Sequence, residues 1–287
     1  MSESNKRNFI VHGSILAIAG ILVRIIGMLY RIPVVNIIGS EGNGIYGAAF
    51  NIYNIMLVLS SYGLPMAVSK LVSARFTKKR YKSAAKVLRC SLMVAVCTGG
   101  IAALLVFFGA SFIENVIYGG GLPGLAVPLR ILAPTIFLVA ILGVIRGFFQ
   151  GQSTMIPTAV SQILEQIVNA IVSIAAGYGM MKAFASSPDV AAYGAAGSTL
   201  GTAMGALTAV LFMGFLYAVY TPTFNRLKRK DRHTENQSTG QICKIIIYTM
   251  IPIILGQTFY QISALIDDVM FSNIMVGRDI TKSISMD

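Results

Sequence analysis

Long, nearly uninterrupted apolar runs are the feature that most constrains this chain. A run of about 20 apolar residues is long enough to cross the hydrocarbon core of a bilayer as a helix. Seven such spans are predicted, at 10–38, 45–72, 88–113, 126–149, 157–182, 192–219 and 244–272. They are too long and too continuously apolar for barrel strands, and backbone groups in lipid must pair within their own segment. The predicted fold class is therefore an all-α polytopic membrane protein.

The charge pattern agrees with this class. Only 12% of the residues are charged, against about 25% in a typical soluble domain. The formal net charge of +12 comes largely from two basic clusters between spans. They comprise Arg75, Lys78, Lys79, Arg80, Lys82, Lys86 and Arg89, and then Arg226, Lys228, Arg229, Lys230 and Arg232. Because positive loops stay in the cytoplasm, the clusters indicate membrane topology rather than a nucleic-acid partner.

The same rule predicts the orientation. The N-terminus (1–9) and the two basic segments would be cytoplasmic, whereas the loops at 39–44 and 114–124 lack Lys and Arg and would face outward. A signal peptide is not expected, because the first apolar stretch continues past Arg24 without a small-residue cleavage motif. A secondary role of the basic clusters in holding anionic membrane lipids is compatible with this topology.

Four of the spans carry polar residues spaced by three or four, which places each set on one helix face. The stripes are Gly20, Arg24, Gly27 and Arg31 in the first span; Gly47, Asn51 and Asn54 in the second; Gln162, Glu165, Gln166, Asn169 and Ser173 in the fifth; and Gln257, Gln261, Ala264 and Asp268, with Asp267 adjoining, in the seventh. Ionisable groups in lipid are costly, so the stripes are expected to face a wet cavity or one another.

Two interpretations of the stripes remain open. The Gln and Asn side chains could line a cavity, or they could form hydrogen bonds between packed helices. Arg24, in mid-span, favours a cavity because a guanidinium does not deprotonate. Arg31, Arg146 and Lys70 lie nearer span ends and could reach the interface instead. Glu165 could touch a ligand or simply pair with an arginine.

Other features carry no chemistry. Gly197, Gly201 and Gly205 form a GxxxGxxxG pattern, which predicts close helix packing in the sixth span. The three cysteines (Cys90, Cys97 and Cys243) lack metal-ligand spacing and are interpreted as free thiols. The chain has no P-loop, HExxH or GxSxG motif, so neither a catalytic centre nor a metal or cofactor site is predicted.

Residues 146–169, RGFFQGQSTMIPTAVSQILEQIVN, resemble the fourth-to-fifth-helix region of Gram-positive polysaccharide flippases, namely the stage V sporulation protein B and MurJ-type lipid II flippases of the multidrug/oligosaccharidyl-lipid/polysaccharide exporter superfamily. The matching positions are Gln150, Gly151, Pro157, Thr158, Ala159, Ser161, Gln162, Glu165 and Gln166. The segments 23–39, 62–74 and 251–268 are also similar to helices of this family.

The resemblance implies a two-lobed fold with a central cavity, and it implies a function. The expected activity is the transfer of an undecaprenyl-diphosphate-linked precursor, such as lipid II, from the inner to the outer leaflet of the bacterial cell membrane, for peptidoglycan or spore-cortex synthesis. Arg24 and Arg31 match first-helix arginines that contact the diphosphate. Asp267, with Asp268, is the nearest match to a sodium site, so coupling to Na⁺ or H⁺ is expected without any other cofactor.

By the same resemblance, 10–219 would form the N-terminal six-helix lobe, 220–243 a basic cytoplasmic linker, and 244–287 the first helix of a truncated second lobe. The missing lobe is expected in cis or as a separate chain, and this chain alone is expected not to flip lipid. Three alternatives remain: a multidrug cation antiporter of the same superfamily, an inactive remnant, and a membrane enzyme of lipid-linked glycan assembly.

Overall fold

The computed structural model describes residues 3–232 and 237–277, which fold into a bundle of long helices. The helices are α1 (Glu3–Ser60), α2 (Gly63–Thr77), α3 (Tyr81–Phe112), α4 (Ala126–Gly151), α5 (Ile156–Ala183), α6 (Val190–Lys230) and α7 (Thr239–Gly277), and a π-helical turn, η1 (Ile113–Ile117), follows α3. No strand occurs in the described part of the chain. The prediction of an all-α polytopic membrane protein is confirmed.

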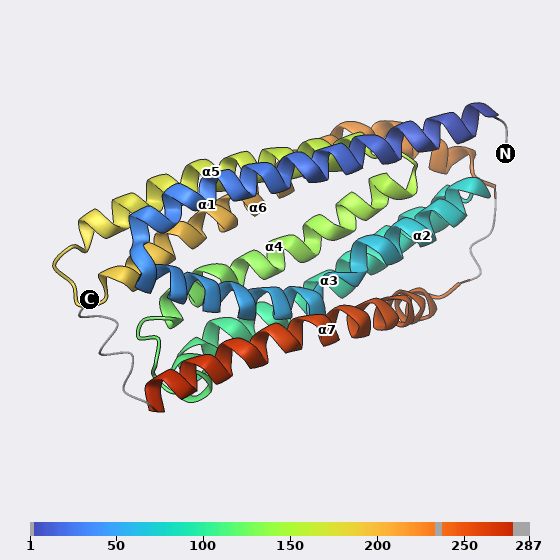
Figure 1. Ribbon diagram of the computed structural model, residues 1–287. Helices are drawn as coiled ribbons and strands as arrows, with labels where there is room; N and C mark the ends of the chain where they lie inside the picture. The colour runs from blue at the N-terminus through green and yellow to red at the C-terminus, as the bar shows by residue number, and fades with distance from the viewer. Residues whose placement is uncertain (1–2, 233–236, 278–287) are drawn as a thin grey trace.

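Six helical segments are long and apolar enough to cross a membrane, and the first of them, Gly13–Thr77, contains two predicted spans. The expected loop at 39–44 was wrong, because the chain remains helical there and only Gly39 departs from helical geometry (φ 71°, ψ −178°). This conformation is open to glycine alone. Figure 1 shows the chain reversing at this bend, so the two predicted passes are present without a loop between them.

The second predicted span, 45–72, is not one continuous helix. It breaks at Ser61 and Tyr62, between α1 and α2. Pro65 stands in the first turn of α2, where its missing N–H is tolerated but where an uninterrupted helix would lose a hydrogen bond. Gly63 lies against Met250 of α7, and a Cβ atom at Gly63 would come within 2.9 Å of that side chain. Helix α7 therefore packs against the chain at this break.

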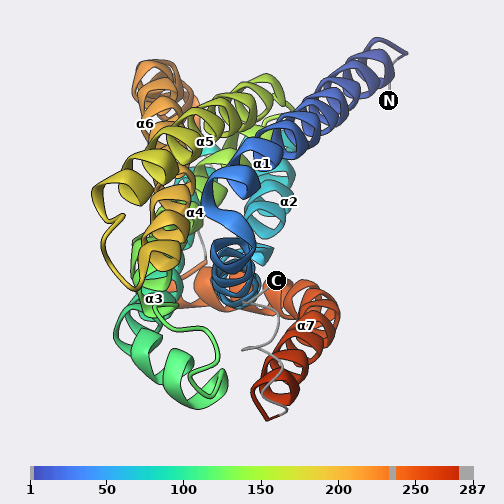
Figure 2. The same cartoon turned by 60° about the vertical axis from the view of Figure 1, so that its left-hand side comes forward.

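Helix α4 lies in the middle of the bundle, with α5 and α6 on one side and α7 on the other, in both Figure 1 and Figure 2. Its large side chains Leu129, Leu132, Ile136 and Phe148 are fully buried. The first half of α1 is peripheral by contrast: Ile21, Met28 and Ile32 are about 60% exposed (58%, 65% and 60%). Apolar exposure of this extent fits a chain whose surroundings are lipid.

The predicted GxxxGxxxG packing is confirmed. A Cβ atom at Gly197 would lie 2.4 Å from the Ala176 carbonyl oxygen, one at Gly201 2.0 Å from Ser173 Oγ, and one at Gly205 2.6 Å from the Glu165 carbonyl oxygen. These three glycines bring α6 into direct contact with the backbone of α5. The contact includes the end of the α5 polar stripe, since Gly201 lies against Ser173 and Asn169.

The two basic clusters meet at one end of the bundle. Helix α6 extends to Lys230, so much of the predicted linker 220–243 is helical; its last turn holds Lys228, Arg229 and Lys230, which the helix dipole favours there. Beyond it, one oxygen of the buried Asp231 carboxylate accepts the backbone N–H of Lys82 at 2.8 Å. Figure 1 shows the start of α1 and the end of α2 at this same end.

Candidate functional site along α1 and α5

The acid of the α5 stripe is paired with an arginine of α4. Arg146 Nη2 lies 2.7 Å from Glu165 Oε2, and Arg146 Nε donates a 2.9 Å hydrogen bond to Ser161 Oγ. The two charged side chains are 14% and 26% exposed. Of the two interpretations of Glu165, the geometry agrees with pairing, and Arg146 is engaged with α5 instead of reaching for the interface.

A hydrogen-bonded network surrounds Asn169 and joins three helices. Its Nδ2 donates to the Tyr30 hydroxyl of α1 at 3.2 Å, and its Oδ1 accepts from Ser173 Oγ at 2.9 Å. The hydroxyl of Thr202, on α6, lies 3.4 Å from the same oxygen. Ser173 Oγ also lies 2.8 Å from the Ser198 carbonyl oxygen. Asn169 is only 8% exposed, so its polar atoms are satisfied inside the bundle, as helix–helix bonding requires.

The network continues toward the bend in α1. Tyr46, in the second half of α1, is close enough to Tyr30 in the first half to interact with it. The Arg31 guanidinium stands over the Tyr46 ring, 5.9 Å from its centroid, within range of a cation–π interaction. Arg31 is nevertheless exposed. Its charge is thus held at one edge of the network without a carboxylate partner among the described residues.

The stripes of α1 and α5 face each other. Gly27 lies against Gln166, since a Cβ atom there would come within 3.1 Å of Gln166 Nε2. Arg24 and Arg31 flank this contact on the exposed side of α1. A guanidinium in a membrane-spanning helix requires water, an anion or another protein surface, so this edge of the lobe is unlike the apolar surface around it.

The remaining predicted residues are placed as follows. Asn51 and Asn54 are partly buried in the second half of α1, and Gln162 is partly buried on α5. Glu165 is close enough to Tyr53, in that same half of α1, to interact with it electrostatically. Gln257 is exposed on α7, which packs against α1, α2 and α3. The side chains of Gln261, Asp267 and Asp268, including the candidate cation site, lie outside the described residues.

Two residues of this site, Tyr30 and Tyr46, were not predicted from the sequence. Their signal was weak: each is a single tyrosine in an apolar run, next to Arg31 in one case and Gly47 in the other. Buried tyrosine hydroxyls need partners, which was the available clue. Within the described part of the chain, no three His, Cys, Asp or Glu side chains gather in a way that could hold a metal ion.

Comparison with known proteins agrees with these observations. Residues 10–279 match the family model described as polysaccharide biosynthesis protein. Three Bacillus subtilis (strain 168) proteins are similar: lipid II flippase MurJ (34% identity, 59% of this chain and 32% of the relative), stage V sporulation protein B (30%, 72% and 39%) and the uncharacterized membrane protein YabM (29%, 85% and 44%). The chain thus spans less than half the length of each relative.

Solved transporter structures share the fold. MATE in the straight conformation aligns with a TM-score of 0.70 at 17% identity, over 88% of this chain and 53% of that one. MATE in complex with MaD3S aligns with a TM-score of 0.68, also at 17% identity, over 85% and 52%. The relatives whose names state an activity are flippases or transporters rather than enzymes.

Proposed function

Because the chain belongs to the polysaccharide biosynthesis protein family, we propose that α1–α6 form one wall of a path that moves a lipid-linked glycan across the membrane. The cargo class is an undecaprenyl-diphosphate-linked cell-wall precursor of the lipid II kind, carried from the inner to the outer leaflet. In support, MurJ, a similar protein, is a lipid II flippase.

One observation carries the proposal: the pairing of Glu165 with Arg146 leaves Arg24 and Arg31 exposed on the facing helix. Arg24 and Arg31 are seven residues apart, which places them two turns apart on the same side of α1. A diphosphate has two phosphoryl groups, and each arginine can bind one of them bidentately. Gln166 of α5, which lies against Gly27 between the two arginines, suits the hydroxyl and amide groups of a glycan, and Gln162 stands one turn before it on the same helix.

A binding series tests this assignment on the chain as it exists. Thermal unfolding in detergent would be followed with undecaprenyl diphosphate, undecaprenyl monophosphate and undecaprenol. The proposal predicts tightest binding for the diphosphate, by about ten-fold over the monophosphate, which corresponds to about 1.4 kcal/mol. Equal affinities for all three compounds would show that the polyprenyl chain alone is recognised, and would refute the diphosphate site.

We further propose that transport requires a second wall opposite Arg24 and Arg31, in cis or from a separate chain. Exposed guanidinium groups facing only lipid would be costly, and an opposing lobe would enclose them in a wet cavity. In proteoliposomes, residues 1–287 alone should bind the lipid-linked diphosphate without moving it between leaflets. Translocation by this chain alone would contradict the requirement.

The basic end of the bundle is proposed to face the cytoplasm of a bacterial cell. A variant without native cysteines would carry either Ser186→Cys, at the opposite end, or Thr77→Cys, at the basic end. A membrane-impermeant maleimide should label intact cells only at residue 186, and at residue 77 only after permeabilisation. The reverse pattern would overturn the orientation.

A cation antiporter is the second candidate, since the solved structures with this fold include multidrug MATE transporters. A cationic drug would need an unpaired carboxylate on the cavity face. Glu165 does not meet that need, because Arg146 neutralises it. Coupling to Na⁺ or H⁺ through Asp267 or Asp268 remains a proposal of its own, and a Na⁺ dependence of binding that is lost in Asp267→Asn would support it.

A further inference from the structure

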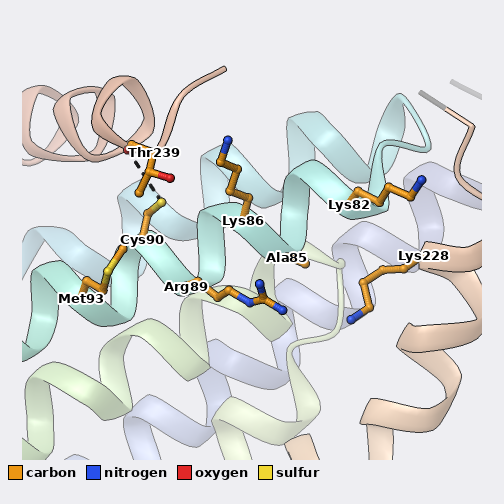
Figure 3. Close-up of a pocket in the computed structure, with 8 residues that line it drawn as sticks. All are labelled: Lys82, Ala85, Lys86, Arg89, Cys90, Met93, Lys228 and Thr239. Atoms are coloured by element: carbon orange, nitrogen blue, oxygen red, sulfur yellow. Dashed lines mark hydrogen bonds between the residues drawn. The ribbon is translucent and has the colours of Figure 1, made fainter. Parts of the chain in front are cut away.

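A basic pocket lies at the end of the bundle, away from the α1–α5 site. It has a volume of about 520 Å³, and it is lined by Lys82, Ala85, Lys86, Arg89, Cys90 and Met93 of α3, Lys228 of α6 and Thr239 of α7. Figure 3 shows that the two basic clusters, far apart in the sequence, contribute side chains to this one pocket. A volume of this size is typical of small-molecule sites.

The charges in the pocket are not balanced by the residues that line it. Four of the eight lining residues are cations, and none of the eight is acidic. The nearby Asp231 directs one carboxylate oxygen to the backbone N–H of Lys82 and is 4% exposed. Figure 3 shows the Arg89 and Lys228 side chains pointing toward one another from α3 and α6. Like charges repel at such a site, and an anion between them would relieve the repulsion.

The two remaining lysines extend the same positive surface. Lys86 donates to the carbonyl oxygen of Gln237, which ties α3 to the segment before α7. Lys82 is exposed at the start of α3, and a second basic hollow adjoins it, lined by Lys82, Asn225, Lys228 and Arg229. An anion here would therefore meet charge from α3 and α6 at once, next to the N-terminus of α3, whose dipole also favours it.

Beyond the pocket, toward the C-terminal end of α3, the same face of the helix becomes apolar. Lys82, Lys86, Arg89, Met93 and Val96 follow one another at steps of three or four, so they lie on a single face of α3. The same face continues with Leu104 and Phe107, and the side chains from Met93 onward are exposed. Along α3 the surface thus changes from cationic to apolar. A phospholipid has the same sequence of chemistry, a charged phosphate head group followed by apolar acyl chains.

We propose that this pocket binds the phosphate of an anionic phospholipid, with the acyl chains of the lipid lying along the exposed face of α3. A soluble phosphate would account for the four cations but not for the apolar continuation. The lipid would contact α3, α6 and the start of α7, and so would stabilise the position of α7 relative to the other helices. The site is separate from Arg24 and Arg31, and it does not depend on the proposed transport function.

The test uses the full chain in a neutral detergent, with thermal unfolding followed during titration. The probes are phosphatidylglycerol, phosphatidylcholine and glycerol phosphate. Phosphatidylglycerol has both a net negative charge and acyl chains, phosphatidylcholine has acyl chains without net charge, and glycerol phosphate has the charge without acyl chains. Phosphatidylglycerol should stabilise the wild type most, and the Arg89→Gln/Lys228→Gln variant should bind it about ten-fold more weakly. If that variant does not fold, each single substitution should weaken binding by a smaller factor.

A matched control removes the same amount of charge from the same end. Lys78 and Lys230 are exposed but do not line the pocket, so Lys78→Gln/Lys230→Gln should bind phosphatidylglycerol as the wild type does. An equal loss in this control would show general attraction to a basic surface and would overturn the site. Equal stabilisation by glycerol phosphate would overturn the lipid assignment, and equal stabilisation by phosphatidylcholine would overturn the role of charge.

Discussion

Arg146 of α4 and Glu165 of α5 form an ion pair with 2.7 Å between Nη2 and Oε2, and this pair decides which arginines of the lobe remain available. Glu165 is the acid of the α5 stripe, so its engagement by Arg146 leaves Arg24 and Arg31 without a carboxylate among the described residues. Ser161 supports the pair from the same helix.

A double-mutant cycle tests the pair. Removing one partner leaves the other charge partly buried, so Glu165→Gln and Arg146→Gln should each lower the free energy of unfolding, by about 1–3 kcal/mol. The double variant should lose less than the sum of the two single losses, because it leaves no unpaired charge. Thermal unfolding in one detergent gives all four values. Strictly additive losses would mean that the two side chains do not interact.

The glycines of α6 provide a second prediction. Gly201→Ala should destabilise the protein by about 1–3 kcal/mol, because the new methyl group would overlap Ser173 and the α5 backbone. Gly214→Ala on the same helix is the matched control, since nothing lies within 4 Å of a Cβ atom there. The midpoint of thermal unfolding distinguishes them. A neutral Gly201→Ala would contradict the close contact of α5 and α6.

The placement of α7 is testable through two native thiols. Cys90 Sγ of α3 lies 3.8 Å from the carbonyl oxygen of Thr239 in the first turn of α7, and Cys243 lies one turn further along the same face of α7, so mild oxidation should join the two thiols in a disulfide. With a protease site introduced at 233–236, the two fragments should remain linked on a non-reducing gel. Cys90→Ser should abolish the link, whereas Cys97→Ser should not, because Cys97 is exposed and lies two turns away from Cys90 along α3. Fragments that separate in the wild type would place α7 elsewhere.

Much of the fold was predictable, because span length and helical spacing are local properties of the sequence. The stripe of α5 and the contact surface made by Gly197, Gly201 and Gly205 follow directly from residues three or four apart. The reversal of the chain near Gly39 was predicted as a loop at 39–44, and its form as a bend at one residue was not, since an isolated glycine in an apolar run does not reveal its backbone angles. The break before Pro65 was predicted only in part: a proline within a span indicates a kink or a broken helix, but because a proline is also tolerated in the first turn of a helix, its position alone did not show where α2 begins.

The site was less predictable, because its partners are distant in sequence. Asn169 bonds with Tyr30, which lies 139 positions earlier, and Glu165 pairs with Arg146, 19 positions earlier on the preceding helix, and not with Arg24 or Arg31 of α1. The basic clusters were recognised as topology signals, but their meeting in one pocket required the packing of α3 against α6. The helical period predicts which residues share a face of a helix, but it does not predict which other helix packs against that face.

The most direct test of the central claim is the preference for diphosphate over monophosphate in three proteins: the wild type, Arg24→Gln/Arg31→Gln, and Glu165→Gln. Binding of undecaprenyl diphosphate and undecaprenyl monophosphate would be measured at a temperature where all three are folded. The account predicts that the wild type and Glu165→Gln keep a preference of about ten-fold, whereas the arginine variant loses it. A preference that survives removal of both arginines, or that disappears with Glu165 alone, would contradict the account.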